Sequence, residues 1–172
     1  KSRLALDLER RAGFTRIASD EVRKELAGLP PTRSARAGFG EGIYTAEWNE
    51  RTYAACLDRA RAALLEGGRA VVDATFREEA NRRRFAALAG ELAVPFRVFV
   101  RVAPDEVVRQ RLERRGTYSV SDADWAVHQE AARRWEPFSE GIAAVACVIG
   151  HQADKEGPFR KAMELLEAAG LA

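Results

Sequence analysis

Two polar residues stand at the start of the chain, directly ahead of a helical pattern, and their types suit phosphate chemistry. Lys1 and Ser2 precede residues 3–12, where leucines recur at helical spacing and Gly13 supplies a stop signal. A Lys-Ser pair that opens a helix is the end of the pattern G-x-x-x-x-G-K-[ST]. In that pattern backbone N–H groups hold phosphates, the lysine reaches the β and γ phosphates, and the hydroxyl binds Mg²⁺. Alone the pair is a weak signal, because many helices have a polar start.

A carboxylate and a guanidinium follow the first predicted strand, residues 14–19. Asp20 stands at the carboxyl end of that strand, where open α/β sheets bind ligands, and Arg23 lies one helical turn further on the same face. Together they suit a hydroxyl acceptor beside an anionic group, with Asp20 taking the hydroxyl proton. Asp20 or Ser19 can also cap the next helix, and the two roles are compatible.

A second carboxylate ends residues 69–73, a compact β-branched segment that predicts a buried parallel strand. Asp73 at such a strand end is typical of a residue that holds Mg²⁺ directly or through water. The alternative is that Asp73 caps the following helix, which we expect over residues 77–92.

Arginines gather further along the chain. Arg111 and Arg115 are four residues apart and share a helix face just before a glycine breaks the helix. Arginines beside an irregular segment suit a lid, around residues 111–121, that closes over ATP and neutralises phosphate charge. A solvated basic face is the alternative. Three consecutive arginines, 82–84, cannot all face one site, so we interpret them as mostly solvated surface.

Alternating strands and helices must position these groups. The expected strands are residues 14–19, 69–73, 96–102 and 143–149, and the expected helices are residues 3–12, 19–26, 46–65, 77–92, 105–114, 122–135 and 158–169. This order predicts a single α/β domain over residues 1–172, with three layers, a mainly parallel sheet and right-handed crossovers. In a complete domain of this kind a strand feeds the first helix, whereas here Lys1 and Ser2 precede it directly.

Composition narrows the classes of protein. The 172 residues suit one domain, and 28 basic against 26 acidic side chains give a net charge of +2, which does not indicate a dedicated nucleic-acid binder. Cys56 and Cys147 have no His or Cys nearby at metal-ligand spacing, so we expect buried reduced thiols. No apolar run approaches the roughly 18 residues of a membrane span, and no signal peptide opens the chain. A cytoplasmic location is therefore expected.

In their order and spacing these segments resemble the zeta-toxin and polynucleotide-kinase-like P-loop kinases, often described as AAA-type ATP-binding proteins. In that family a strand after the Walker A helix ends in a pair such as Ser-Asp, with an arginine three residues on, which Ser19, Asp20 and Arg23 match. A second strand ends in a triplet such as Asp-Ala-Thr, matched by residues 73–75. The lid is matched by residues 111–116, and a Ser-Asp-Ala stretch at 121–123 begins the next helix.

The resemblance implies a P-loop NTPase fold with ATP and Mg²⁺ as cofactors. Lys1 would bind phosphate and assist catalysis, and Ser2 and Asp73 would hold the metal. Arg111 and Arg115 would contact ATP phosphates, Arg115 with a catalytic role. The glycines of the Walker A loop and the strand before it lie outside the given sequence. We therefore expect a longer gene product, an open position at the centre of the sheet, and poor nucleotide binding by these residues alone.

The resemblance also implies an acceptor site, with Asp20 as general base and with Arg23 and Thr75 in contact with the substrate. The expected reaction transfers the γ-phosphate of ATP to a hydroxyl of a small molecule or nucleotide, and residues 32–46 would help to shape the pocket. One alternative is a nucleotide-binding regulatory module without kinase activity. Another is a polynucleotide 5′-hydroxyl kinase, which the near-neutral charge disfavours. Similar domains occur fused behind an aminoglycoside-phosphotransferase-like domain, so such a fusion partner is expected, and a membrane partner is not.

Overall fold

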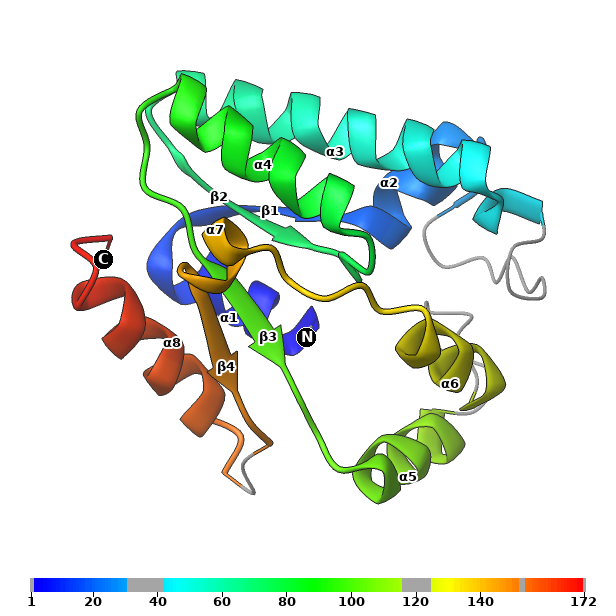
Figure 1. Ribbon diagram of the computed structural model, residues 1–172. Helices are drawn as coiled ribbons and strands as arrows, with labels where there is room; N and C mark the ends of the chain where they lie inside the picture. Colours follow the sequence, from blue (N-terminus) through cyan, green and yellow to red (C-terminus); the bar gives the residue numbers. More distant parts are fainter. Residues whose placement is uncertain (1, 31–41, 116–124, 152–153, 172) are drawn as a thin grey trace.

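The computed structural model describes residues 2–30, 42–115, 125–151 and 154–171, in which helices alternate with short strands (Figure 1). In chain order the elements are α1 (Ser2–Ala12), β1 (Phe14–Ala18), α2 (Ser19–Leu26), the 3-10 helix η1 (Gly42–Tyr44), α3 (Ala46–Leu65), β2 (Arg69–Asp73), α4 (Glu79–Glu91), β3 (Val98–Arg101), α5 (Asp105–Arg115), α6 (Trp125–Arg133), α7 (Glu140–Ala143), β4 (Ala146–Ile149) and α8 (Gly157–Glu167). The predicted α/β class is confirmed.

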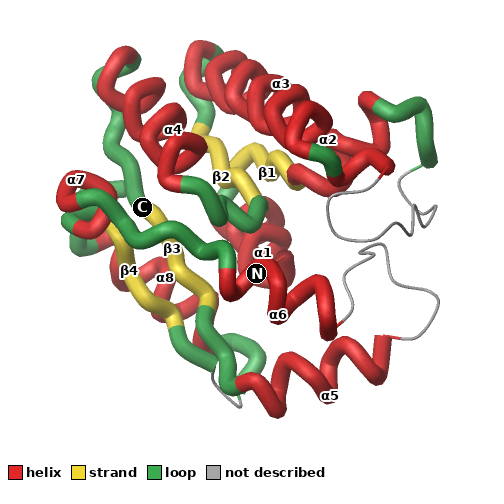
Figure 2. The backbone as a smooth tube through the Cα atoms, turned by 45° about the vertical axis from the view of Figure 1, so that its right-hand side comes forward, coloured by secondary structure: helices red, strands yellow, loops and turns green. Residues whose placement is uncertain are grey.

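The strands form two parallel pairs. β1 pairs with β2 in a register that sets Ala18 opposite Asp73, and β3 pairs with β4 in a register that sets Arg101 opposite Ile149. Within the described residues no hydrogen-bond ladder joins β2 to β3 (Figure 2). The prediction of a mainly parallel sheet is confirmed, and in the described residues the two strand pairs form separate hydrogen-bond ladders.

Helices cover both faces of the strands. On one face α1 packs against β1, β2 and α8, around a cluster that includes Leu8, Ile149 and Leu166. Val71 of β2 and Phe99 of β3 both pack against this cluster, so it spans the two strand pairs. On the other face α2, α3 and α4 enclose a second cluster that includes Ile17, Val22, Tyr53, Cys56 and Phe85. The predicted three-layer architecture is therefore confirmed (Figure 1).

Two predicted helix caps are wrong. α2 begins at Ser19 itself, its N-cap residue is Ala18, and no side-chain hydrogen bond caps it. The N-cap residue of α4 is Glu78, because the chain continues past Asp73 in an irregular loop before the helix starts. Asp20 lies in the first turn of α2, where a carboxylate is still favoured by the positive end of the helix dipole.

The last predicted strand is shorter than expected. Residues 143–149 were predicted to be extended, but the short helix α7 ends at Ala143 and β4 begins only at Ala146. Ile142 of α7 is buried, so this helix turn places an apolar side chain in the core just before the strand. The irregular segment 116–121 and the start of the predicted helix over 122–135 lie outside the described residues.

One of the three consecutive arginines, 82–84, differs from the prediction that they form mostly solvated surface. Arg83 is exposed and Arg84 is half-buried, but Arg82 is only 1% exposed. The cause is helical geometry: consecutive residues point in directions about 100° apart, so one of three arginines can face inward while its neighbours stay in water.

Both cysteines are unpaired thiols. Cys56 is fully buried, as predicted, and burial raises its pKa to about 11. Cys147 is half-buried rather than buried. In the described part of the chain, no helix combines the length and the apolar character needed to cross a bilayer.

Candidate functional site

Asp20 lies at the carboxyl end of β1, in the first turn of α2. Its Oδ2 lies 3.2 Å from the Nζ of Lys24, and its Oδ1 accepts a hydrogen bond of 3.3 Å from the hydroxyl of Tyr44. The Lys24 contact is an ion pair whose geometry is not that of a hydrogen bond, and Oδ2 is a buried atom that accepts no hydrogen bond from the described residues. A buried acceptor without a donor is costly, so Oδ2 suits an incoming hydroxyl or water.

Arg23 is buried beside Asp20, on the same helix. Its Nη1 donates to the carbonyl of Ile43 at 2.8 Å, and its Nη2 donates to Oδ1 of Asn49 at 2.6 Å. The guanidinium carbon lies 5.2 Å from the ring centre of Tyr44. Burial lowers the pKa of Arg23. Arg23 therefore braces η1 against the start of α3, and its predicted contact with a substrate stays a prediction.

Asp73 ends β2 directly beside the end of β1, because the register pairs it with Ala18. The two predicted carboxylates, Asp20 and Asp73, thus lie at the same edge of one strand pair. Asp73 is only 7% exposed. A buried carboxylate at a strand end fits the sequence prediction of a metal-supporting residue.

The loop after Asp73 is held by a tyrosine from α3. Thr75 Oγ1 lies 3.4 Å from the hydroxyl of Tyr53, and the same hydroxyl accepts a 2.9 Å hydrogen bond from the N–H of Phe76. Phe76 has a left-handed φ of 46°, and its ring makes edge contacts with Tyr53 and Phe85. Tyr53 thereby fixes a strained turn that presents the exposed Thr75 next to Asp73.

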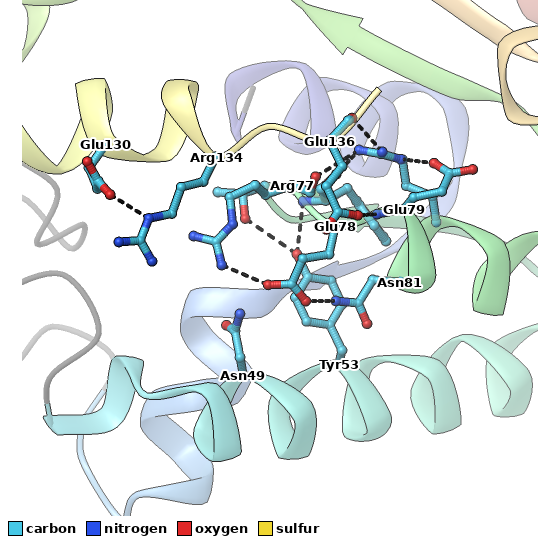
Figure 3. A network of polar contacts seen from close by, with 12 residues as sticks. Asn49, Tyr53, Arg77, Glu78, Glu79, Asn81, Glu130, Arg134 and Glu136 are labelled. Atoms are coloured by element: carbon cyan, nitrogen blue, oxygen red, sulfur yellow. Dashed lines mark hydrogen bonds and ion pairs between the residues drawn. The ribbon is translucent and has the colours of Figure 1, made fainter. Parts of the chain in front are cut away.

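Further polar residues surround this loop. Figure 3 shows Asn49 and Tyr53 projecting from α3 toward the segment with Arg77 and Glu78. Nη2 of Arg77 donates to Glu78 Oε1 at 2.7 Å, and Nδ2 of Asn81 donates to Glu78 Oε2 at 3.2 Å. These contacts give the loop an ordered polar surface on the side of α3.

The start of α1 lies toward the same end of the strands. Gly13, with a φ of 68°, reverses the chain between α1 and β1, so the first turn of α1 points toward the carboxyl ends of β1 and β2 (Figure 1). Ser2 is the first residue of the helix and is exposed. Lys1 lies outside the described residues, so its predicted phosphate contact stays a prediction.

The predicted lid is described only in part. Arg111 on α5 is exposed, and its Nη2 lies 3.2 Å from Nδ1 of His151, which follows β4. Arg101 at the end of β3 donates to the carbonyls of Ile149 and Gly150, and burial together with the charge of Arg111 lowers the pKa of Arg101. The side chain of Arg115 and residues 116–124 lie outside the described part.

The donor set at the strand ends fits Mg²⁺. Ser2 offers a hydroxyl and Asp73 a carboxylate, and hard cations prefer such oxygen ligands. The described residues include no group of three or more His, Cys, Asp or Glu side chains that could hold a metal. Mg²⁺ is commonly bound by one or two protein ligands together with water and nucleotide phosphates, so a larger cluster is not required.

A separate hollow of about 420 Å³ lies along the outer edge of β1. Its walls include Arg16 and Glu21, which form an ion pair, and Glu25 and Arg59, which form another. None of the predicted site residues lines it, and its charged walls are already paired. The hollow is therefore not the candidate site.

Sequence reasoning missed four residues of the site: Lys24, Tyr44, Asn49 and Tyr53. Lys24 could have been found, because it lies four residues after Asp20 on a predicted helix. The other three reach the site from beyond a long loop or from the middle of α3, and no spacing along the sequence signals such contacts.

Comparison with known proteins bears on the family and the fold of this chain. A profile of the AAA domain family matches residues 1–138. The structure of the Deinococcus radiodurans tunicamycin resistance protein resembles this chain with a TM-score of 0.58 and 20% sequence identity, over 98% of this chain and 90% of that one. A search of curated protein sequences found no match. The structural likeness shows a shared fold, and the profile covers most of the sequence. The chain therefore belongs to the AAA domain family.

Proposed function

We propose that this P-loop nucleotide-binding domain is a kinase, which transfers the γ-phosphate of ATP to a hydroxyl of a small molecule or nucleotide. The observation that carries the proposal is the buried Oδ2 of Asp20, which accepts no hydrogen bond from the described residues and lies beside the strand that ends in Asp73. The family and the fold support nucleotide binding. Within that family we favour the zeta-toxin and polynucleotide-kinase-like group.

Asp20 acts as the general base in this proposal. The acceptor hydroxyl donates a hydrogen bond to the carboxylate and then its proton, while its oxygen forms a bond to the γ-phosphorus. The bond between that phosphorus and the β–γ bridging oxygen breaks, and ADP leaves with the electron pair. Tyr44 and Lys24 hold the carboxylate in place during this step.

The nucleotide side of the proposed site uses the start of α1. Lys1 and the first N–H groups of the helix would hold the phosphates, and Ser2 and Asp73 would hold Mg²⁺. The bound metal would neutralise charge on the β and γ phosphates. Arg111 and Arg115 would contact the ATP phosphates, because guanidinium groups are well suited to charge that spreads over phosphate oxygens.

The acceptor side is bounded by Thr75, which offers a hydroxyl, and by the Arg23–Asn49 pair. Because the two Nη atoms of Arg23 bind Ile43 and Asn49, we propose that Arg23 acts on the acceptor chiefly by holding Asn49, whose amide N–H groups remain for the substrate. We also propose that the protein is cytoplasmic, that it is fused to an aminoglycoside-phosphotransferase-like domain, and that it has no membrane partner.

The first test is calorimetric titration with Mg²⁺-ATP. It uses this chain, a version that begins with a complete Walker A loop and its strand, and the Asp20→Asn variant of that version. We expect binding by the longer version and equal binding by the variant. Transfer of labelled γ-phosphate is then measured against sugars, nucleosides, aminoglycosides and a 5′-hydroxyl oligonucleotide, and Asp20→Asn should abolish it.

The outcomes separate the alternatives. If neither version binds ATP, the kinase proposal fails while the fold stands. If ATP binds but no acceptor is phosphorylated, the regulatory module is favoured. Salt-sensitive oligonucleotide binding together with transfer to its 5′-hydroxyl would identify a polynucleotide kinase.

A further inference from the structure

Arg82 is the largest fully buried side chain in the described part of the chain, and its guanidinium is completely satisfied. A guanidinium carries five N–H donors in a fixed fork. The five acceptors are one carboxylate and four main-chain carbonyls: Glu79 Oε2 at 2.5 Å, Phe76 O at 2.6 Å, Arg77 O at 3.1 Å, Glu136 O at 2.7 Å and Pro137 O at 3.0 Å. Arg82 thus joins two irregular segments that are far apart in sequence.

Other hydrogen bonds connect the same two segments (Figure 3). The N–H of Glu136 donates to the carbonyl of Arg77 at 3.0 Å, and the carboxylate of Glu136 accepts from the N–H of Glu79 at 2.6 Å. The carboxylate of Glu79 accepts from the N–H of Ser139 at 3.0 Å and from its hydroxyl. We call these contacts, with those of Arg82, the Arg82 joint.

The charge state of Glu79 suits this role. Desolvation opposes its ionisation, but hydrogen bonds from Ser139 and Arg82 outweigh that effect and hold the pKa of Glu79 below its usual value. Two rings enclose the guanidinium as well, with their centres 5.3 Å (Trp135) and 4.8 Å (Phe138) from its central carbon. Arg82 and Glu79 therefore form a charged pair, and the two aromatic rings flank its guanidinium.

The two joined segments have different neighbours. Residues 76–79 continue the loop that holds Asp73 and Thr75, and residues 135–139 form the connection from α6 to α7. Besides the joint, α7 packs against α4, whereas α6 has no extensive packing against the strands in the described part of the chain. A buried arginine is a poor choice for stability alone, because apolar replacements often serve as well.

We propose that Arg82 is a positioning residue, which sets the loop of Asp73 and Thr75 against the α6–α7 connection and so fixes the acceptor side of the site. This rests on the proposed function for its role in the reaction, but the joint itself can be tested without any substrate. Lysine cannot replace the guanidinium, because one ammonium has three donors and no planar fork.

The experiment is amide hydrogen exchange followed by NMR on the substrate-free chain, with Arg82→Lys compared with wild type. Arg84→Lys is the matched control, since Arg84 lies on the same helix and only pairs with Glu50 near the surface. Three reporter amides lie in the joint (Glu79, Glu136 and Ser139), and a fourth, Phe76, lies beyond it and donates to Tyr53. We expect all four to exchange about tenfold faster or more in Arg82→Lys, with amides of α3 and α8 unchanged.

Unchanged exchange at the four amides would overturn the proposal, and so would an equal acceleration at every amide, which would mean a general loss of stability. If Arg82→Lys does not fold, Glu136→Ala replaces it: Glu136 is exposed, and its loss should speed exchange at Glu79 and Phe76 alone.

Kinetics then test the role in the reaction. In a version with phosphoryl-transfer activity, Arg82→Lys should lower kcat and raise the KM for the acceptor, with the KM for ATP unchanged. An equal loss for both substrates would contradict positioning at the acceptor side. If wild type transfers no phosphate, the proposed function fails, while the exchange result still decides the joint.

Discussion

Lys24 and Asp20 form an ion pair along one turn of α2, with 3.2 Å between Nζ and Oδ2, and the lysine side chain is 0% exposed. A lysine is rarely fully buried unless it is paired. Here its charge faces the carboxylate that we propose as the general base. This ion pair therefore holds the Asp20 carboxylate against α2.

Replacing this lysine tests the pairing. We expect Lys24→Met to lower the rate of phosphoryl transfer about tenfold or more, because the variant removes the cation that orients and stabilises the Asp20 carboxylate. The affinity for ATP should not change. The control is Lys161→Met on α8, where an exposed lysine pairs with Glu164. Full activity of Lys24→Met in steady-state kinetics would contradict the assigned role.

Asn49 should matter for stability through Arg23. Asn49→Ala removes the acceptor of Nη2 and leaves a buried donor unsatisfied, which costs roughly 1–3 kcal/mol of unfolding free energy. Glu50→Ala, one residue on, loses only an exposed ion pair with Arg84 and should cost less than about 1 kcal/mol. Urea unfolding of the two variants measures the difference, and equal losses would mean that the Arg23–Asn49 contact is not important.

Tyr53 should hold the loop of Thr75. In Tyr53→Phe the N–H of Phe76 loses its acceptor, so we expect a loss of roughly 1–2 kcal/mol in unfolding free energy and faster exchange of that one amide. Thermal unfolding and NMR exchange check both effects. Unaltered exchange at Phe76 would show that another group, such as water, replaces the hydroxyl.

The raised pKa of Cys56 predicts that the unfolding free energy falls at alkaline pH. Its folded pKa of about 11 lies above the ordinary value of 9.0, so the unfolded chain loses the thiol proton first. The stabilising contribution is complete below about pH 9 and is lost as the pH rises toward 11, with a slope of at most about 1.4 kcal/mol per pH unit. Urea unfolding between pH 8 and about 11 should give a shallower decline for Cys56→Ala than for wild type. Parallel curves would refute this assignment.

The parts of the fold that follow local patterns were predictable. The strand that precedes Asp20 and the strand that ends in Asp73 could be found because a buried parallel strand is a short β-branched run with a polar residue at or just after its end. The register that brings these ends together follows from parallel pairing. The short helix α7 could not be found, because one turn around Ile142 has no periodicity to detect.

The roles of side chains were less predictable than the strands. Arg82 has a sequence neighbourhood typical of solvated surface, and only the approach of residues 136 and 137, more than fifty positions away, buries it. Arg23 was placed correctly beside Asp20, but no spacing along the chain indicates that Ile43 and Asn49 occupy its donors. Contacts that join distant segments depend on tertiary structure, which local spacing does not record.

The break between β2 and β3 bears on how the molecule comes apart. Backbone ladders hold each strand pair internally, whereas the two pairs are joined on one face through side chains of α1 and α8, with Leu8 at the centre. The hydrogen bonds within each strand pair join backbone groups and do not depend on residue type, whereas the packing between the pairs depends on the side chains. The coupling between the two strand pairs on this face therefore depends on a few apolar side chains, so Leu8→Ala should lower the cooperativity with which the described parts of the chain unfold.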